Sequence, residues 1–229
     1  MNPNFCIIIP FYNEESTVIK VAKNLIKTGY PLLFVDDGST DRSNSLLENL
    51  QEAIGGFDIL SYTPNKGKGY AMKKGSKWAI SQGFEYMLFM DADGQTVIED
   101  IENFLIVARR DEEAKIIIGN RLSHPKRMPK IRLVTNRVMS WIISLLAYQH
   151  IIDSQCGFRM VHKDVFAHKL IEDRFGLESE ILIKAGRISQ KILNCPIKCI
   201  YIKERVSKIS PLKDTIKFIK MIFKCLIIR

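Results

Sequence analysis

The sequence predicts a mixed α/β fold in which a mostly parallel sheet carries helices on both faces. Three observations support this prediction. Short apolar runs alternate with amphipathic stretches of ten or more residues, 46% of the 229 residues are hydrophobic, and no apolar run approaches the roughly twenty residues needed to cross a bilayer. Strands that alternate with helices of this length pair in parallel, because each helix returns the chain to the same end of the sheet.

Five strands are expected in the first half of the chain, four of them followed by a helix. β-branched residues predict a strand over 5–10, and the amphipathic stretch that opens at Asn13 predicts a helix ending at Lys27. The other expected elements are strands at 32–35, 59–62, 86–90 and 115–118, with helices from the cap at 39–41 to Glu52, over 70–82 and over 97–109.

The regular alternation ends after Leu122. A basic loop with prolines precedes a predicted helix over 136–146, a strand-like pair at 160–161, and two shorter elements near 178–185 and 197–202. Residues 211–229 interleave apolar side chains with four lysines, which predicts a basic amphipathic helix. The sequence therefore predicts one domain over residues 1–210 and a C-terminal segment over 211–229 that associates with a membrane.

The formal net charge is +9, and most of the excess follows residue 115. A basic half indicates an anionic partner: a nucleotide diphosphate, a lipid phosphate, an anionic membrane surface or a nucleic acid. Basic and aromatic residues do not recur in a pattern typical of nucleic-acid binding, so no nucleic-acid partner is expected. The five scattered cysteines predict reduced thiols, and no secretory signal is recognised, so a cytoplasmic location is expected.

Carboxylates follow two of the predicted strands. Asp36 and Asp37 follow the second, and Asp91 and Asp93 follow the fourth. An ionised carboxylate at the rim of an apolar core is costly unless it is paired or bound to a metal, and ligands of such sheets bind at the carboxyl ends of the strands. With Gln95 as a further oxygen ligand, this pattern predicts a site for Mg²⁺ or Mn²⁺ beside a diphosphate.

The loop over 65–69 is either a flexible turn or a diphosphate-binding loop. It lacks the ending of a Walker loop, but it stands at a strand end before a helix, where backbone N–H groups and Lys68 can meet an anion. Glu14 is either a first-turn residue of the helix or a contact to a base or ribose. The four histidines have no serine or cysteine elbow, so a hydrolytic triad is not expected.

Taken together, the motifs resemble those of the family 2 glycosyltransferases with the GT-A fold. They are IIPFYNEE at 8–15, VDDGSTD at 35–41, NKGKG at 65–69 and MDADGQ at 90–95. Three further motifs, GNR at 119–121, QCGFR at 155–159 and SKISP at 207–211, are similar to the dolichyl- and polyprenyl-phosphate mannosyl- and glucosyltransferases. The resemblance covers residues 5 to about 211.

This resemblance implies a Rossmann-like GT-A sheet and a set of site residues. The nucleoside pocket would be lined by Pro10, Tyr12, Glu14, Val35 and Asp37. The donor would be contacted by Lys68, Asp91 and Ala92, the metal coordinated by Asp93 and Gln95, and the diphosphate met by Arg121, Arg205 and Lys208. Asp91, Asp93 and Arg121 would form the catalytic group, and the acceptor side would fall on 122–146 and 153–159.

The resemblance also implies an inverting transfer of a hexose from UDP-glucose or GDP-mannose to a polyprenyl phosphate at the cytoplasmic face of a membrane. A lipid phosphate is already ionised and needs no strong base, whereas a hydroxyl acceptor does. Glu178 and Glu180 are either such a base or the polar face of a helix. Two alternatives remain: a hydroxyl-acceptor transferase of surface glycan synthesis, and a non-catalytic nucleotide-sugar-binding or membrane-scaffolding subunit.

Overall fold

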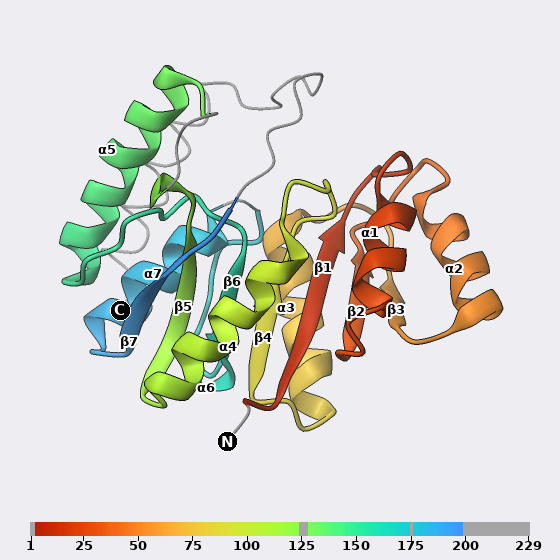
Figure 1. Ribbon diagram of the computed structural model, residues 1–229, viewed down its shortest axis with the longest axis horizontal. Coiled ribbons are helices and arrows are strands. Elements are labelled where there is room, and N and C mark those ends of the chain that lie inside the picture. The colour runs from red at the N-terminus through yellow and green to blue at the C-terminus, as the bar shows by residue number, and fades with distance from the viewer. Residues whose placement is uncertain (1–2, 124–127, 175, 199–229) are drawn as a thin grey trace.

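The computed structural model describes residues 3–123, 128–174 and 176–198, and it has the mixed α/β architecture that the sequence predicts (Figure 1). The strands are β1 (Phe5–Phe11), β2 (Leu32–Asp36), β3 (Asp58–Ser61), β4 (Tyr86–Phe89), β5 (Ala114–Asn120), β6 (Arg159–His162) and β7 (Lys191–Pro196). The α-helices are α1 (Val18–Ile26), α2 (Ser43–Ile54), α3 (Lys68–Ser81), α4 (Ile101–Arg110), α5 (Lys130–Ala147), α6 (Lys163–Phe166) and α7 (Leu177–Arg187). Short 3-10 turns, η1 (Ile98–Asp100) and η2 (Arg121–Ser123), precede α4 and follow β5.

The strands form one sheet in the order β3-β2-β1-β4-β6-β5-β7. Among the described strands only β6 runs against the others, since it pairs antiparallel with both β4 and β5 while the remaining pairs are parallel. The chain leaves β1 toward β2 and β3, then returns to add β4 on the other side of β1. Ligands of open α/β sheets bind at such a reversal, outside the carboxyl ends of the strands.

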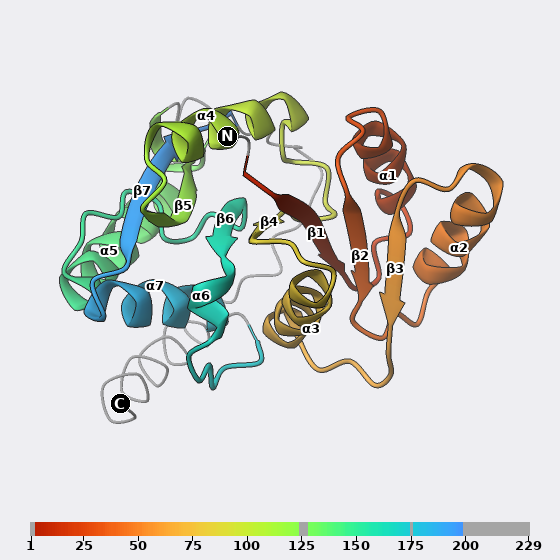
Figure 2. The same ribbon diagram turned by 90° about the horizontal axis from the view of Figure 1, so that it is seen from below.

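Helices cover both faces of this sheet. Figure 2 shows α1 and α4 on one face and α3, α6 and α7 on the other. Every residue of β1, β2 and β4 is buried, as expected for central strands covered on both sides. Helix α3 approaches the sheet closely at Gly75, where an added Cβ would lie 2.8 Å from Ile8 and 3.1 Å from Val35. This packing holds the middle of α3 against β1 and β2.

Two helices begin two or more residues earlier than the sequence predicts. Helix α5 begins at Lys130, six residues before the expected start, because Pro129 supplies a fixed φ of −56° at the N-cap. Helix α3 begins at Lys68, directly after Gly67, whose φ of +104° is open to glycine but strained for other residues.

The expected element over 197–202 is tested only at Ile197 and Lys198, and the strand before it was not predicted. That strand is β7, which ends at Pro196, while Ile197 and Lys198 belong to no regular element and 199–202 lie outside the described residues. Pro196 has no N–H to donate, and the N–H of Ile197 bonds to the carbonyl of Asn120 at 3.2 Å, just beyond the end of the strand. The short helix α6 was not predicted. The segment 211–229 also lies outside the described residues, and within the described ones no helix has the length and apolarity of a membrane span.

Candidate active site

The two predicted acidic clusters lie at the carboxyl ends of β2 and β4, on either side of β1. Asp36 is the last residue of β2, and the N–H of Asp37 donates to the carbonyl of Phe11 at the end of β1. Asp91 lies two residues beyond the end of β4, after Met90, whose N–H bonds to Ile8 of β1. The sheet therefore brings both clusters to the reversal point, as the sequence predicts.

Asp37 holds the 65–67 loop in place. Its buried carboxylate accepts hydrogen bonds from the Tyr62 hydroxyl (2.8 Å), the Asn65 amide (2.9 Å) and the backbone N–H groups of Lys66 (2.9 Å) and Gly67 (2.9 Å). These bonds fix the loop that leads into α3 and so place Lys68 at the helix start. The neighbouring Asp36 accepts two hydrogen bonds from Ser39, and burial raises its pKa.

Lys68 joins two carboxylates at the centre of the site. Its Nζ lies 2.6 Å from Asp91 Oδ1 and 3.1 Å from Glu178 Oε1 at the start of α7. Burial opposes the charge on each group, but the two carboxylates outweigh it and raise the pKa of Lys68, while the ammonium lowers the pKa of Asp91. Lys68 and Asp91 are therefore both ionised at neutral pH.

Gly157 and Arg159 complete this cluster from the segment before β6. A Cβ at residue 157 would lie 2.5 Å from Asp91 Oδ2 and 3.0 Å from Lys68 Nζ, so only glycine leaves room for the ion pair. Arg159 is fully buried and donates to the carbonyls of Cys156, Ser154 and Glu178. Its guanidinium thus connects the 154–156 turn to the first turn of α7.

Arg121 lies at the end of β5 and is held by a buried carboxylate. Its Nε and Nη2 donate to the two oxygens of Asp153 at 2.8 and 2.9 Å, and its backbone N–H bonds to the same group at 3.2 Å. Asp153 is completely buried. The bidentate geometry fixes the plane of the guanidinium, whose positive charge also lowers the pKa of Asp91. Arg121 and Asp91 therefore belong to one site.

The predicted metal ligands Asp93 and Gln95 lie on one tight turn after β4, where Asp93 Oδ1 accepts the backbone N–H of Gln95 at 2.9 Å. Both residues are partly exposed. Across the described residues, no three His, Cys, Asp or Glu side chains are grouped to hold a metal by themselves. This donor set fits Mg²⁺ or Mn²⁺, which often take one or two protein oxygens and complete their shell with phosphates and water.

The predicted nucleoside residues divide between exposed and buried positions. Tyr12 is exposed, whereas Pro10 and Val35 are buried register partners of β1 and β2. The hydroxyl of Thr17 donates to the carbonyl of Ala92 at 2.8 Å, and its oxygen lies 3.2 Å from the carboxylate of Glu14. Thr17, which the sequence analysis missed, therefore ties the first loop to the 91–93 turn.

Glu178 and Glu180, the two candidate bases, have different environments. Glu178 belongs to the Lys68 cluster. The fully buried Glu180 accepts the backbone N–H groups of Ile171 and Glu172 and pairs with Lys184 at 2.8 Å. It therefore anchors the loop before α7.

Sequence reasoning did not single out Asp153, Gly157 or Arg159 individually. All three fall within the 153–159 segment that the resemblance placed on the acceptor side, and a buried aspartate or arginine has no signal in one sequence. The predicted diphosphate contacts Arg205 and Lys208 lie outside the described residues.

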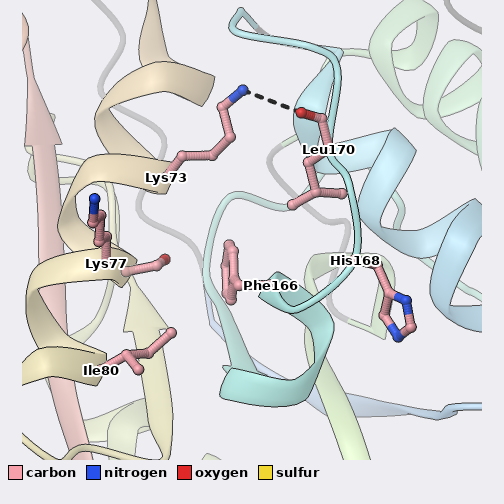
Figure 3. Close-up of a pocket in the computed structure, with 7 residues that line it drawn as sticks. Lys73, Lys77, Ile80, Phe166, His168 and Leu170 are labelled. Atoms are coloured by element: carbon pink, nitrogen blue, oxygen red, sulfur yellow. Dashed lines mark hydrogen bonds between the residues drawn. The ribbon is translucent and has the colours of Figure 1, made fainter.

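A separate hollow of about 300 Å³ lies between α3 and the segment around α6. It is lined by Lys73, Ser76, Lys77, Ile80, Phe166, His168 and Leu170. Figure 3 shows Lys73 reaching across it to the carbonyl oxygen of Leu170, at 3.4 Å. None of its lining residues belongs to the predicted site, and the Lys73 contact braces α3 against the loop that follows α6.

Known proteins resemble the chain in both sequence and fold. It is 31% identical over 214 residues to the UDP-N-acetylglucosamine–dolichyl-phosphate N-acetylglucosaminyltransferase of Methanococcus voltae, covering 85% of each chain. It is 27% identical over 223 residues to a dolichyl-phosphate beta-glucosyltransferase of Trichomonas vaginalis, covering 89% of this chain and 68% of that protein.

The fold is similar to that of glucosyl-3-phosphoglycerate synthase from Mycobacterium tuberculosis, solved in complex with Mn²⁺, uridine diphosphate and glucosyl-3-phosphoglycerate. The TM-score is 0.68, with 14% identity, and the match covers 97% of this chain and 80% of that one. This likeness confirms the GT-A fold. Residues 6–170 match Glycosyl transferase family 2, and with the sequence relatives this match shows that the chain is an enzyme of the family 2 glycosyltransferases.

Proposed function

We propose that the enzyme transfers a hexose from a nucleotide sugar to a polyprenyl phosphate, with inversion at the anomeric carbon. An oxygen of the acceptor phosphate forms the new bond to that carbon. The bond from the carbon to the nucleoside diphosphate breaks, and its electron pair leaves with the diphosphate. UDP-glucose and GDP-mannose are the donors that the sequence suggests, and the names of relatives add UDP-N-acetylglucosamine.

The observation that carries this proposal is that the two candidate bases at the site already have partners. Glu178 is bound to Lys68, and Glu180 is occupied by two backbone N–H groups and Lys184. The lowered pKa of Asp91 makes it a weak base. A hydroxyl acceptor needs a group that takes its proton, whereas a phosphate monoester is already ionised. The site therefore favours a phosphate acceptor.

The residues of the site have separate roles in this transfer. Lys68 holds Asp91 ionised and oriented at the end of β4, where Asp91 contacts the donor. The guanidinium of Arg121, fixed by Asp153, faces the diphosphate and stabilises the negative charge that grows as it leaves. Asp93 and Gln95 would hold Mg²⁺ or Mn²⁺, which supplies further positive charge to the leaving diphosphate.

The test is transfer of labelled sugar from UDP-glucose, UDP-N-acetylglucosamine and GDP-mannose to a short-chain polyprenyl phosphate in detergent. Each donor is assayed with Mg²⁺, with Mn²⁺ and with a chelator. We expect labelled lipid from one donor with metal and none with the chelator. Asp93→Ala should lose this product, whereas Glu52→Gln, a change of an exposed carboxylate on α2, should keep it.

A parallel reaction offers water-soluble sugars and alcohols as acceptors. A glycosylated alcohol without any labelled lipid would reject the phosphate acceptor and favour the surface-glycan alternative. Donor binding without transfer to either acceptor would favour the non-catalytic alternative. Full transfer by Asp93→Ala would remove Asp93 from the metal site.

A further inference from the structure

Helix α5 exposes a continuous row of large apolar side chains. The row, here called the α5 stripe, recurs at spacings of three and four residues and therefore lies along one face of the helix. Its members are Ile131, Val134, Val138, Trp141, Leu145 and, directly after the helix, Tyr148. Ile131 is 77% exposed, Trp141 64% and Tyr148 78%. At about 1.5 Å per residue the stripe is about 25 Å long.

The opposite face of α5 packs on the protein, and it is partly polar. The buried residues of the helix are Asn136, Ser140, Ile143 and Ala147. Ser140 accepts the backbone N–H of Ser154 at 2.8 Å. A helix that covers a core normally turns its apolar side inward and its polar side to water. In α5 the largest apolar side chains face outward, so packing among the described residues does not explain the pattern.

The stripe is held at a fixed position relative to the active site. Ser154, bonded to α5, directly follows Asp153, whose carboxylate holds Arg121. On its other side α5 lies against α7, where Gly186 allows the close approach of Ala147. Figure 1 shows α5 at one end of the molecule, beyond β5 and β7. A surface that binds the stripe therefore also sets the position of the site.

The charge of α5 indicates what binds this stripe. The helix contains Lys130, Arg132 and Arg137 and no acidic residue. Lys130 and Arg137 are exposed, and at 100° per residue both lie beside the stripe. A second copy of this chain would bring the same cations to the interface. The segment 211–229 would bring Lys213, Lys217, Lys220 and Lys224. Both occupants are disfavoured by like charge.

We infer that the α5 stripe is a membrane-docking surface that inserts into the interface of an anionic bilayer. A row of Trp, Tyr, Leu, Val and Ile flanked by Lys and Arg is the composition of helices that lie in the plane of a membrane. Tyr and Trp favour this layer because one end of the ring is apolar and the other polar. The inference deepens the proposed function and rests on it in one respect: a polyprenyl-phosphate acceptor is itself anchored in a bilayer.

Trp141 provides a direct test, because the chain has only one other tryptophan. Trp78 is partly buried and packs on the core, so Trp78→Phe leaves Trp141 as the reporter. Vesicles of equimolar phosphatidylglycerol and phosphatidylcholine are added without donor or acceptor. We expect the emission of Trp141 to shift to the blue and to be quenched by lipids with brominated chains. Vesicles of phosphatidylcholine alone should bind less protein.

Two sets of variants separate this stripe from exposed apolar residues in general. Val134→Ser, Val138→Ser and Leu145→Ser together remove three members, and vesicle affinity should fall by about tenfold or more. The control combines Ile54→Ser and Ile188→Ser, which are exposed but lie elsewhere, and should bind as wild type does. Circular dichroism and the melting temperature establish that each variant is folded.

The outcomes distinguish this inference from the proposed function. The triple variant is expected to lose both vesicle binding and transfer to acceptor in vesicles. Transfer in detergent by a wild-type protein that does not bind vesicles would overturn the docking surface and leave the function. Vesicle binding by a wild-type protein that transfers no sugar would overturn the proposed function and leave the docking surface. Emission of Trp141 that is already blue-shifted in buffer would indicate that the segment 211–229 covers the stripe. Dimers that are lost in the triple variant would indicate that a second copy covers it. Either result would overturn the inference.

Discussion

Lys68 and Asp91 form an ion pair with a Nζ–Oδ1 distance of 2.6 Å at the start of α3 and just beyond the end of β4. The pair joins the start of α3 to the turn that follows β4, at the point where the strand order reverses. Lys68 keeps 18% of its side chain exposed and Asp91 41%, so the ammonium is the more deeply placed partner. Asp91 thus presents an oriented and ionised carboxylate to the open side of the site.

Replacing Lys68 by methionine tests this relationship. Lys68→Met leaves Asp91 and Glu178 without their shared cation, so Asp91 loses its orientation and its low pKa. We expect sugar transfer to fall roughly 100-fold or more, the scale of losing one fixed electrostatic contact in an active site. Stability should fall by about 1–3 kcal/mol, since water screens part of the unpaired charge on Asp91. Kinetics and urea unfolding measure the two effects.

A double variant separates the two effects. Lys68→Met with Asp91→Asn removes both charges of the pair, so most of the lost stability should return while activity stays low. Recovery of activity in the double variant would contradict the role of the ionised Asp91 in contacting the donor.

Gly157→Ala addresses the same pair from the other side. The new Cβ would lie 2.5 Å from Asp91 Oδ2, so the carboxylate must move. We expect a large fall in kcat with a small change in melting temperature, because Asp91 has an exposed side to move toward. Gly75→Ala is the matched control: its Cβ would meet Ile8 at 2.8 Å, so it should cost about 1–3 kcal/mol of stability and leave kcat nearly unchanged. The reverse pattern in the two variants would contradict the assignment of Gly157.

The strands and helices of the first half were predictable because helices cover both faces of the sheet there. This burial gives each element a regular pattern of apolar residues. β1, β2 and β4 are continuous apolar runs, and each lies where the sequence predicts. The later elements were harder to place. β7 is an edge strand that exposes Lys191 and Pro196 and leaves Asn194 half-buried, so its pattern is weak. The prediction fell instead on the more apolar run over 197–202, of which the structure describes only Ile197 and Lys198.

The acidic residues of the site were predictable from their places at strand ends, but their partners were not. Asp37 was expected in the nucleoside pocket, and its carboxylate also holds the 65–67 loop. The pairing of Arg121 with Asp153 joins residues 32 positions apart, and that of Lys68 with Glu178 joins residues 110 apart. Such contacts arise from the strand order, which a single sequence does not display.

His162 predicts a loss of stability on mild acidification. Burial, with the nearby Lys115, lowers the pKa of His162 and outweighs the attraction of Asp164. The ring packs on Tyr86, and its Nδ1 accepts the N–H of Asp164, which requires the neutral form. Because the pKa of His162 in the folded protein is lower than the unfolded pKa of about 6.5, its contribution to stability is fully present above about pH 6.5. This contribution is lost as the pH falls through the folded pKa.

We therefore expect the unfolding free energy of the wild type to fall more steeply from about pH 7.5 to about pH 5.5 than that of His162→Gln. Urea unfolding at several pH values makes the comparison, and an NMR titration of the ring reports the pKa directly. A ring that titrates at or above its ordinary value would contradict the prediction.

Asp153 is expected to act on catalysis through Arg121. Asp153→Asn keeps the shape of the side chain, but it removes the charge and one of the two acceptors that fix the guanidinium. The guanidinium of Arg121 would then be held less firmly beside the diphosphate, and a shift of about 1 Å is enough to cost roughly 100-fold in rate. Because the contact strengthens as the diphosphate departs, kcat should fall more than KM rises.

Arg121→Lys is the companion variant: it keeps the charge but lacks the fork for a bidentate pair, and it should show the same kcat loss. A rise in donor KM with unchanged kcat in both variants would instead assign the pair to ground-state binding.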